Sequence, residues 1–525
     1  MELGRLGVRC ILVEKRKQID PHPRASLLGA RSMEYFRRHG LADRLLAAGI
    51  PTDQRYEIRF VTSLNGYLLH HYSSPSPDEY RQMHRGQRTP TPDAFWSPYF
   101  KVQIGQNTIE PILREHISTM AQVDVRTGCA LTGFQQDAHG VTATVEDVAT
   151  GKPQQIRARY LAACDGGRSP IRQQLDIPYT GRGAIGRNRS FLFRSHQLTE
   201  LAKTGRANLH FVFQPKVYGV ITDIDGRGLY NYSHFDPEPK VEDIDPAALL
   251  CKAMGRDFAF EILGTQDWWH HQSVADRFRA GRVFLLGDAA HLFCPTGGIG
   301  MNTAICDAFD LGWKLAATLQ GWGGARLLDS YELERWPVAV RNTITAADNR
   351  DKIDTVMQTL PAAAAQDGPG GDAAREHLSI RLKWVARQFS SMGAHLGARY
   401  IDSPIVIGDG SAEPPDDPKI VSQSAWPGCR APHAWLDPER STLDLFDGRH
   451  FVLLRLGDDA PPAAPFAHAA HEYKIPFQCH TIADPAIGSL YETRLVLVRP
   501  DGHVCWRGDN LPDAASKVLA TVSGH

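Results

Sequence analysis

Apolar side chains recur along this chain with two different periods, and the changes of period divide it into segments. A short apolar run at residues 8–13 predicts a buried strand. Residues 24–41 repeat apolar side chains at helical spacing, which predicts a helix that Gly40 terminates. Residues 106–120 predict another helix after an irregular Pro-rich region, and residues 123–148 predict strands joined by turns. Alternating strands and helices are typical of an α/β fold.

The period changes to strict alternation between residues 181 and 275, which predicts half-buried strands. We therefore expect an antiparallel sheet inserted into the α/β domain. The chain then returns through a buried strand at 282–286 to a helix at 301–320. The alternation is clearest in three segments: 209–213, 219–224 and 229–235.

A helical connection follows at about 340–400, interrupted by the segment AAAAQDGPGGDAA, and a Pro/Asp-rich linker follows at about 404–434. The last part of the chain again alternates strands and helices. These changes predict the following domains: an α/β domain at 1–180 and 276–345, an inserted sheet domain at 181–275, a helical connection at 346–410, and a linker with a final domain at 411–525.

Composition narrows the function classes. The 525 residues exceed what one hydrophobic core usually organises. The 58 basic and 59 acidic side chains nearly cancel, so a small molecule is a better partner than nucleic acid or a membrane. The nine cysteines form no CxxC and no metal-like cluster, which predicts buried thiols in a reducing compartment and no metal. The chain starts with charged residues and contains no apolar run of about 18 residues, so we expect a soluble cytoplasmic protein.

A candidate ligand site follows the predicted strand at 283–286. This strand delivers Gly287 and Asp288 to its carboxyl end, where open α/β sheets bind their ligands. Asp288 can accept hydrogen bonds from sugar hydroxyls. The Gly-rich loop at 295–300 then leads into a helix, whose positive end favours an anion. The order of strand, aspartate, loop and helix predicts a ligand that carries both hydroxyls and negative charge.

Glu14 ends the first predicted strand. In dinucleotide-binding βαβ units an acidic residue at this place accepts hydrogen bonds from the ribose, about 20 residues after a glycine-rich turn. Counting back from Glu14 places that turn before Met1. We therefore expect a chain that starts inside the first helix, lacks the first strand and its G-x-G-x-x-G, and binds the dinucleotide weakly. A simple surface carboxylate is the alternative interpretation of Glu14.

Two long motifs occur in the order found in one enzyme family: YLAACDGGRSPIRQQL and GRVFLLGDAAHLFCPTGGIGMNTAICDAFDLGWKLAATLQG. With them, residues 1–345 resemble the group A FAD-dependent aromatic monooxygenases, the family of p-hydroxybenzoate, phenol and polyketide hydroxylases. The match continues through LLDSYELERWPVA. The last domain resembles the thioredoxin-like appendage of the phenol and polyketide hydroxylase branch. Cys479 and Cys505 stand alone there, so packing or dimerisation is a better prediction than disulfide exchange.

The resemblance implies an α/β Rossmann-like FAD-binding domain with an inserted antiparallel substrate sheet, a helical connection and a C-terminal thioredoxin-like domain. It implies an FAD-dependent NAD(P)H:oxygen oxidoreductase. Such an enzyme hydroxylates a phenolic or polyketide-type aromatic substrate with O2 and NADPH or NADH, through a C4a-hydroperoxyflavin. A homodimer is left open.

The resemblance also implies site residues. Asp165 and Arg168 would support the passage of NAD(P)H. The residues implied to bind FAD are Glu14, Arg24, Gln106, Asp165, Gly287, Asp288, Pro295, Gly297, Gly298, Gly300, Met301 and Asn302. No catalytic residue is assigned. The inserted strands, expected to cover the flavin, offer five candidates for a general base or phenol-binding group: His210, Tyr218, Tyr230, Tyr232 and His234.

Three alternatives stay open at this point. A halogenase would carry W-x-W-x-I-P, whereas Trp268 and Trp269 lead here into two histidines. A Baeyer–Villiger-type or ring-cleaving flavin oxygenase would share the same motifs. A flavin-deficient, non-catalytic binding protein on the same fold is the third alternative, and bound FAD in the purified protein would contradict it.

Overall fold

The computed structural model describes residues 1–86, 93–214, 217–236 and 245–525. Its α/β part contains parallel strand pairs, as predicted. Strand β10 pairs in parallel with β17, with Leu161 opposite Val283, and the short β16 adds to β17. Strands β1 and β6 form a second parallel pair, which brings Glu14 beside Thr127. The bounds are β1 Cys10–Glu14, β6 Val123–Thr127, β10 Leu161–Ala163, β16 Arg279–Ala280 and β17 Val283–Leu285.

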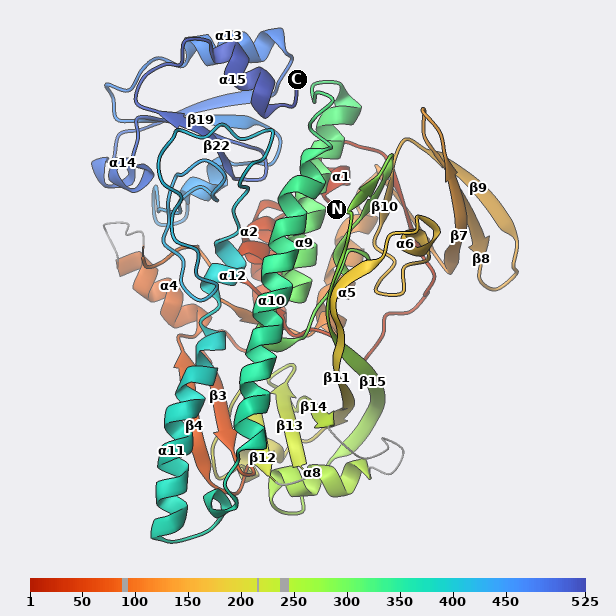
Figure 1. The fold of residues 1–525 in the computed structure, drawn as a ribbon, viewed down its shortest axis with the longest axis vertical. Helices are drawn as coiled ribbons and strands as arrows, with labels where there is room; N and C mark the ends of the chain where they lie inside the picture. Colours follow the sequence, from red (N-terminus) through yellow and green to blue (C-terminus); the bar gives the residue numbers. More distant parts are fainter. Residues whose placement is uncertain (87–92, 215–216, 237–244) are drawn as a thin grey trace.

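Helix α9 (Gly300–Gln320) is the central helix of this part of the fold (Figure 1). Most of its side chains beyond the first two turns are buried, since it is covered by other elements on nearly all sides. It ends at Gly321, whose φ of 84° is the left-handed conformation in which glycine commonly closes a helix. It packs against α1 (Glu2–Arg5). This part of the fold also contains α5 (Gln106–Ser118), α6 (Pro170–Gln174) and the three-stranded sheet of β7 (Cys129–Gln136), β8 (Val141–Asp147) and β9 (Pro153–Ala158).

The helix predicted at residues 24–41 is shorter in the structure. Helix α2 spans Ala30–Arg38 and α3 spans Ala42–Ala48. Leu27 and Leu28 instead form strand β2, which pairs with β5 (Val102–Gln103). The prediction is therefore right for the second half of this segment and wrong for its start. The first residues pair with β5, which is distant in sequence and could not be seen in the local spacing.

An eight-stranded sheet forms the lower part of the molecule in the order β18-β15-β11-β14-β13-β12-β3-β4 (Figure 1). It contains the predicted antiparallel strands, and it extends beyond residues 181–275. Strands β3 and β4 come from the region that sequence analysis treated as irregular and join through a parallel pairing of β3 with β12. The bounds are β3 Tyr56–Val61, β4 Leu68–Ser74, β11 Tyr179–Arg194, β12 Leu209–Gln214, β13 Val217–Asp223, β14 Leu229–Asp236, β15 Glu261–Ala275 and β18 His291–Leu292.

Helices cover both faces of this sheet. Helix α10 (Ser330–Gln358) is 29 residues long, starts in the α/β part and descends beside the sheet together with α11 (Pro369–Ala386) (Figure 1). Both contribute side chains to the apolar cluster on one sheet face. Helix α8 (Pro246–Met254) packs on the opposite face. The short helices α4 (Pro77–Gly86), α7 (Leu198–Leu201) and α12 (Met392–Leu396) complete the connections.

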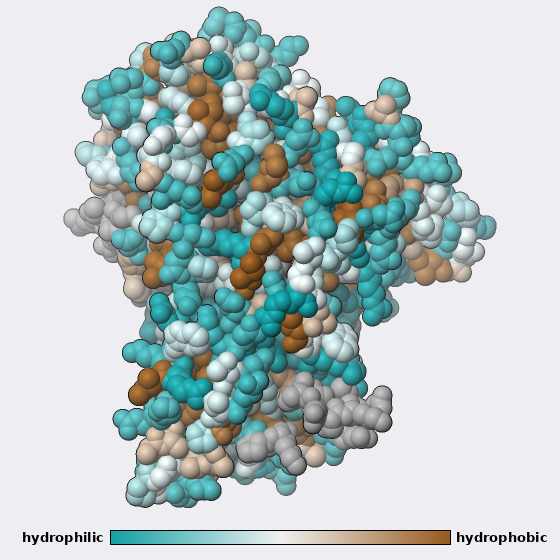
Figure 2. Space-filling view, viewed as in Figure 1, coloured by the Kyte–Doolittle hydropathy of each residue, from teal (hydrophilic) through white to brown (hydrophobic). Residues whose placement is uncertain are grey.

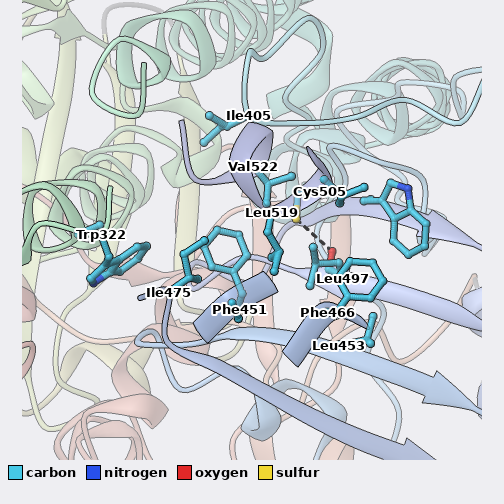
Figure 3. Packing of buried hydrophobic residues seen from close by; sticks show 14 of the residues in the cluster. Trp322, Ile405, Phe451, Leu453, Phe466, Ile475, Leu497, Cys505, Leu519 and Val522 are labelled. Carbon is cyan, nitrogen blue, oxygen red and sulfur yellow. Dashed lines mark hydrogen bonds between the residues drawn. The ribbon is translucent and has the colours of Figure 1, made fainter. Parts of the chain in front are cut away.

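The C-terminal domain has a four-stranded sheet in the order β20-β19-β21-β22, with the mixed pairing expected of a thioredoxin-like domain. Its core is continuous with the α/β part, because Trp313 and Trp322 pack edge-to-face on Phe451 (Trp322 and Phe451 in Figure 3). The bounds are β19 Phe451–Leu456, α13 Ala464–Glu472, β20 Phe477–Ile482, α14 Pro485–Tyr491, β21 Leu495–Val498, β22 Val504–Gly508 and α15 Ala515–Val522. All nine cysteines are free thiols.

Polar side chains dominate the molecular face seen in Figure 2, and its apolar patches are small and separate. Among the helices in the described residues, none combines the length and the apolar character needed to cross a membrane.

Candidate active site

The turn after β17 brings Gly287 and Asp288 to the strand's carboxyl end. Gly287 has a φ of 55°, and a Cβ there would lie 3.1 Å from the Cβ of Ala304 on α9. Glycine therefore fits both the backbone conformation and the close helix. The Asp288 side chain is exposed. Partial desolvation raises the pKa of Asp288, and the charges of His291 and Arg24 oppose that shift. Asp288 is thus available to accept hydrogen bonds from ligand hydroxyls.

Asp307 on α9 holds this turn in place, and sequence analysis missed it. Its Oδ2 accepts hydrogen bonds from the Gly287 amide at 3.1 Å and from His291 Nε2 at 2.7 Å. Its Oδ1 accepts from Arg335 Nε at 2.8 Å. Burial alone would raise the pKa of Asp307, but Arg335 and His291 hold it below its usual range. A charged residue at a buried position of an apolar helix was the signal available in the sequence.

The loop between β18 and α9 depends on two successive glycines. Gly297 and Gly298 have φ values of 83° and 64°. A Cβ on Gly298 would lie 2.7 Å from a methyl carbon of Leu27, which is closer than real contacts. The loop leads into the first turn of α9, where the amides of Gly300, Met301 and Asn302 have no intrahelical acceptor. These amides and the helix dipole create a positive region at the loop.

Asn302 uses its whole side chain to join this loop to strand β2 and helix α2. Its Oδ1 accepts from the Gly29 amide at 2.8 Å and from the Ser32 hydroxyl at 2.6 Å. Its Nδ2 donates to the carbonyls of Leu27 at 3.0 Å and Gly298 at 2.8 Å. The amide group has no further bonding capacity of its own. Asn302 is therefore available to a ligand through its backbone N–H, while its side chain positions the loop.

The segment around Asp165 lies beside the Gly287 turn. Asp165 accepts a hydrogen bond from the Ile171 amide at 3.2 Å, at the start of α6, and the Arg168 side chain is exposed. Tyr179 joins the two segments, since its hydroxyl lies 2.8 Å from the Asp288 carbonyl and 3.4 Å from the Gly167 carbonyl. Burial raises the pKa of Tyr179 to about 12, so the hydroxyl is protonated and can donate. Sequence analysis missed Tyr179.

Three further predicted residues lie on the β1 and β2 side of the α/β domain. Glu14 accepts a hydrogen bond from the Arg16 amide at 2.8 Å. The Gln106 backbone N–H donates to the Ala25 carbonyl at 2.8 Å, which places Gln106 next to Arg24, and the Gln106 side-chain amide donates to Glu110 Oε1 at 2.8 Å. The Arg24 side chain is half exposed, and its charge is felt at Asp288. The fold therefore brings Arg24, Gln106 and Asp288 to one side of the molecule.

The five candidates on the inserted sheet do not share a face. Tyr218 packs with Phe213 and Phe235 in the cluster that α10 and α11 cover. Tyr230 and Tyr232 lie on the other face, in the cluster that α8 covers. His234 lies on that same face, because every second residue of β14 does. His210 also lies there, because it is opposite Ile221 on β13, and Ile221 is opposite Tyr232 on β14. The structure thus brings one candidate, Tyr218, to the face turned toward α10.

Strand β15 connects that same face to the loop between β18 and α9. It carries Trp268 and His270 in the sheet and continues to pair with β18, which ends two residues before Cys294. His270 Nδ1 lies 3.1 Å from Cys294 Sγ, and the His270 ring stacks on Trp268 with 4.6 Å between centroids. Sequence analysis did not propose His270 for the site. Its position became evident only from the pairing of β15 with β11 and β18.

These residues fit the extended, hydroxyl-rich and anionic cofactor FAD. The exposed Asp288 carboxylate suits ribityl hydroxyls, and the free amides at the start of α9 suit the electron-rich edge of the flavin ring. A side chain at Gly298 would clash with Leu27 and push this loop away from β2. When bound, FAD accepts hydride from a nicotinamide and activates dioxygen for transfer to a substrate. Fold and site together define a flavin-dependent oxygenase.

The chain belongs to the family of FAD-dependent aromatic-ring hydroxylases. Residues 1–346 match the FAD binding domain family, and residues 424–525 match the aromatic-ring hydroxylase C-terminal family. The resemblance stated from the sequence motifs is therefore confirmed, and with it the fold class, FAD as the cofactor, and an oxidoreductase that hydroxylates aromatic compounds. The non-catalytic alternative has no support in these matches.

One relative is the tetracenomycin A2 monooxygenase-dioxygenase of Streptomyces glaucescens, 33% identical over 99% of this chain and 94% of the relative. The rebeccamycin biosynthetic enzyme RebC with reduced flavin is 37% identical, with a TM-score of 0.88 over 100% of this chain and 96% of RebC. The complex of aklavinone-11 hydroxylase with FAD and aklavinone is 30% identical, with a TM-score of 0.79 over 99% of this chain and 95% of that chain.

Proposed function

We propose that this enzyme hydroxylates a multi-ring, polyketide-type phenol or quinone, using O2 and either NADPH or NADH. The single observation that carries the proposal is the course of β15, which leads an aromatic sheet face directly to the loop beside the predicted flavin ring. Trp268, His270 and Phe235 on that face offer ring contacts to a flat substrate. The likeness to the aklavinone-11 hydroxylase complex supports the substrate class.

The proposal assigns roles along the cofactor. Asp288 holds ribityl hydroxyls, the loop from Pro295 to Gly300 and the amides of Met301 and Asn302 face the ring, and Arg24 and Gln106 support the pyrophosphate side. Asp165 and Arg168 serve the approach of NAD(P)H. The predicted domain bounds stay part of this proposal, with β3 and β4 included in the substrate sheet because they hydrogen-bond to it. A homodimer stays a proposal that light scattering would test.

His270 donates a hydrogen bond to a substrate oxygen in this proposal. Its Nδ1 lies 3.4 Å from the donor Arg350 Nη1 and 3.1 Å from the Cys294 thiol, so Nδ1 is the acceptor and the proton lies on Nε2. Burial lowers the pKa of His270 to about 3, with Arg350 adding to the shift, and the ring is neutral at pH 7. The buried Nε2 has no partner among the described residues. It would stabilise the negative charge of an ionised phenol.

The test is oxidation of NADPH and of NADH by the FAD-loaded enzyme across a panel of single-ring phenols and multi-ring phenols and quinones. Oxygenated product and released peroxide are measured separately. We expect a multi-ring compound to give hydroxylated product in proportion to the nicotinamide consumed. Product from single-ring phenols alone would contradict the substrate class. Insertion of oxygen into a ring bond would favour the Baeyer–Villiger alternative.

Replacing His270 by leucine should lower kcat/KM for hydroxylation about 10- to 100-fold, since a hydrogen bond to a charged oxygen contributes about 1.5–3 kcal/mol. FAD content should not change. His271→Leu is the matched control, because the next residue of β15 points to the opposite sheet face and is only partly buried. Equal losses in both variants would mean that His270 has no specific role in the reaction.

A further inference from the structure

A cavity of about 210 Å³ lies between helix α2 and the C-terminal domain, apart from the residues assigned to the flavin and substrate. Four arginines and three carboxylates line it, and Leu443 and Phe446 add apolar walls. The arginines come from α1 and α2, and most of the remaining wall comes from residues 443–447 and Gly502 of the C-terminal part. The cavity is therefore formed only where the two parts of the chain meet.

Two of the three carboxylates of this cavity have arginine partners, and the third is hydrogen-bonded to a histidine and to backbone amides. Glu34 pairs with Arg31 at 2.9 Å and with Arg430 at 2.5 Å. Asp444 pairs with Arg37 at 2.6 Å. The third carboxylate, Asp447, lies 2.7 Å from Nδ1 of its neighbour on the chain, His450, and accepts two backbone amides. Arg5, the remaining arginine besides Arg38, donates to Glu2 through Nη2 at 2.6 Å and Nε at 3.1 Å, and its Nη1 donates to the Asp447 carbonyl at 2.7 Å.

Arg38 is the exception. Its guanidinium forms no hydrogen bond and no ion pair with any residue that the structure describes, and its contact is with the Tyr35 ring at 5.5 Å. A Cβ on Gly448 would lie 2.8 Å from Arg38 Nη1 and 2.3 Å from Arg5 Nη2, so two guanidiniums meet at this backbone. Burial lowers the pKa of Arg38, while Glu2 and Tyr35 oppose that shift and Arg5 and Arg31 add to it. An unpaired guanidinium in this setting carries a desolvation cost that an anion would remove.

We infer that this cavity binds a small oxyanion, a phosphate group or a carboxylate, through the unpaired Arg38, with the remaining N–H donors of Arg5 beside it. Guanidinium groups suit such anions because their N–H donors match two oxygens at once. The bound anion would also join α2 to the C-terminal domain, since both line the cavity. This site is independent of the flavin chemistry and of the substrate proposed above.

The test uses FAD-loaded protein, in which the pyrophosphate position is already filled. Isothermal titration with inorganic phosphate, with AMP and with acetate is carried out at constant ionic strength set by chloride. We expect at least one probe to bind saturably. The probe that binds most tightly shows whether the natural ligand is free phosphate, a phosphate monoester or a carboxylate. Arg38→Met should weaken that binding at least tenfold. Arg256→Met is the control and should leave the binding unchanged, because Arg256 is exposed and does not line the cavity.

Thermal unfolding provides the second measurement. In chloride alone, Arg38→Met should unfold at the same temperature as the unmodified enzyme or higher, because an unpaired charge is removed from a partly buried position. Phosphate should raise the unfolding midpoint of both proteins slightly, because it stabilises proteins in general. The unmodified enzyme should show a further increase that Arg38→Met lacks, because only the unmodified enzyme binds phosphate specifically. Absence of saturable binding, equal binding in Arg38→Met, or a lower midpoint of that variant in chloride would each overturn the proposal.

Discussion

Replacing Asp307 by asparagine is expected to lower the free energy of unfolding by about 3–5 kcal/mol, the usual cost of removing one partner of a buried ion pair. The side chain is fully buried, and the substitution leaves the Arg335 guanidinium without its carboxylate. Asparagine keeps the volume and an oxygen that can accept from the Gly287 amide. The loss of free energy therefore reports the removed charge of Asp307 and not a change in the size of its side chain. Urea unfolding of the FAD-loaded and FAD-free protein measures it.

The same variant should also weaken FAD binding, because Asp307 positions the turn that presents Asp288. Fluorescence titration of FAD measures this effect. Asp329→Asn is the matched control, since Asp329 forms a surface pair with Arg279 near the start of α10, and exposed pairs contribute about 0–1 kcal/mol. An Asp307→Asn protein with unchanged stability and FAD affinity would contradict the role given to this network.

Arg499→Met should have a comparable effect in a second group of buried charges, formed by Arg499, Lys314, Asp310, Glu334 and Asp501. Arg499 is fully buried in the turn between β21 and β22 and reaches the FAD-binding part, where it lies 2.9 Å from Glu334 on α10 and 3.4 Å from Asp310 on α9. It also binds Asp501 at 2.5 Å. Its removal leaves three buried carboxylates with Lys314 as the remaining cation of the group. We expect a loss of about 3–5 kcal/mol, measured by urea unfolding.

The Arg499→Met deficit should depend on pH. Burial raises the pKa of Asp310 to about 7 although Lys314 and Arg499 oppose the shift, and the variant loses one of those opposing charges. Folded protein then binds more protons than unfolded protein above the ordinary carboxyl pKa, so stability falls as pH rises. The deficit should therefore be larger at pH 8 than at pH 5.5. A deficit that grows toward low pH would contradict this assignment of charge.

Limited proteolysis adds a readout of domain contact, because Arg499 joins the C-terminal domain to α9 and α10. The variant should be cut faster in the linker before residue 435. Arg494→Met is the matched control, since Arg494 lies in the same domain and forms an exposed pair with Asp459. Equal cutting of both variants would mean that the shared apolar core around Phe451 suffices to hold the domains together.

Some of the site could be predicted from local sequence. The strand, Gly287, Asp288 and the loop to α9 are contiguous, so their order alone predicts a turn, exposed amides and a helix N-terminus. The alternation in residues 209–235 predicts strands for the same reason, because side chains on a strand take alternate faces. Which sheet face is turned toward α10 is not local information, and four of the five sheet candidates lie on the face toward α8.

The sequence by itself determined the α/β class, the inserted sheet and the two glycine-containing motifs, because periodicity and backbone demands act over a few neighbouring residues. The tertiary structure alone decided the partners of those motifs. Asp307 meets Gly287 across 20 residues, Tyr179 meets Asp288 across 109, and Arg499 meets Glu334 across 165. Charge pairing and hydrogen bonding depend on distance in space, and only the packing of helices and strands brings these groups within reach of each other.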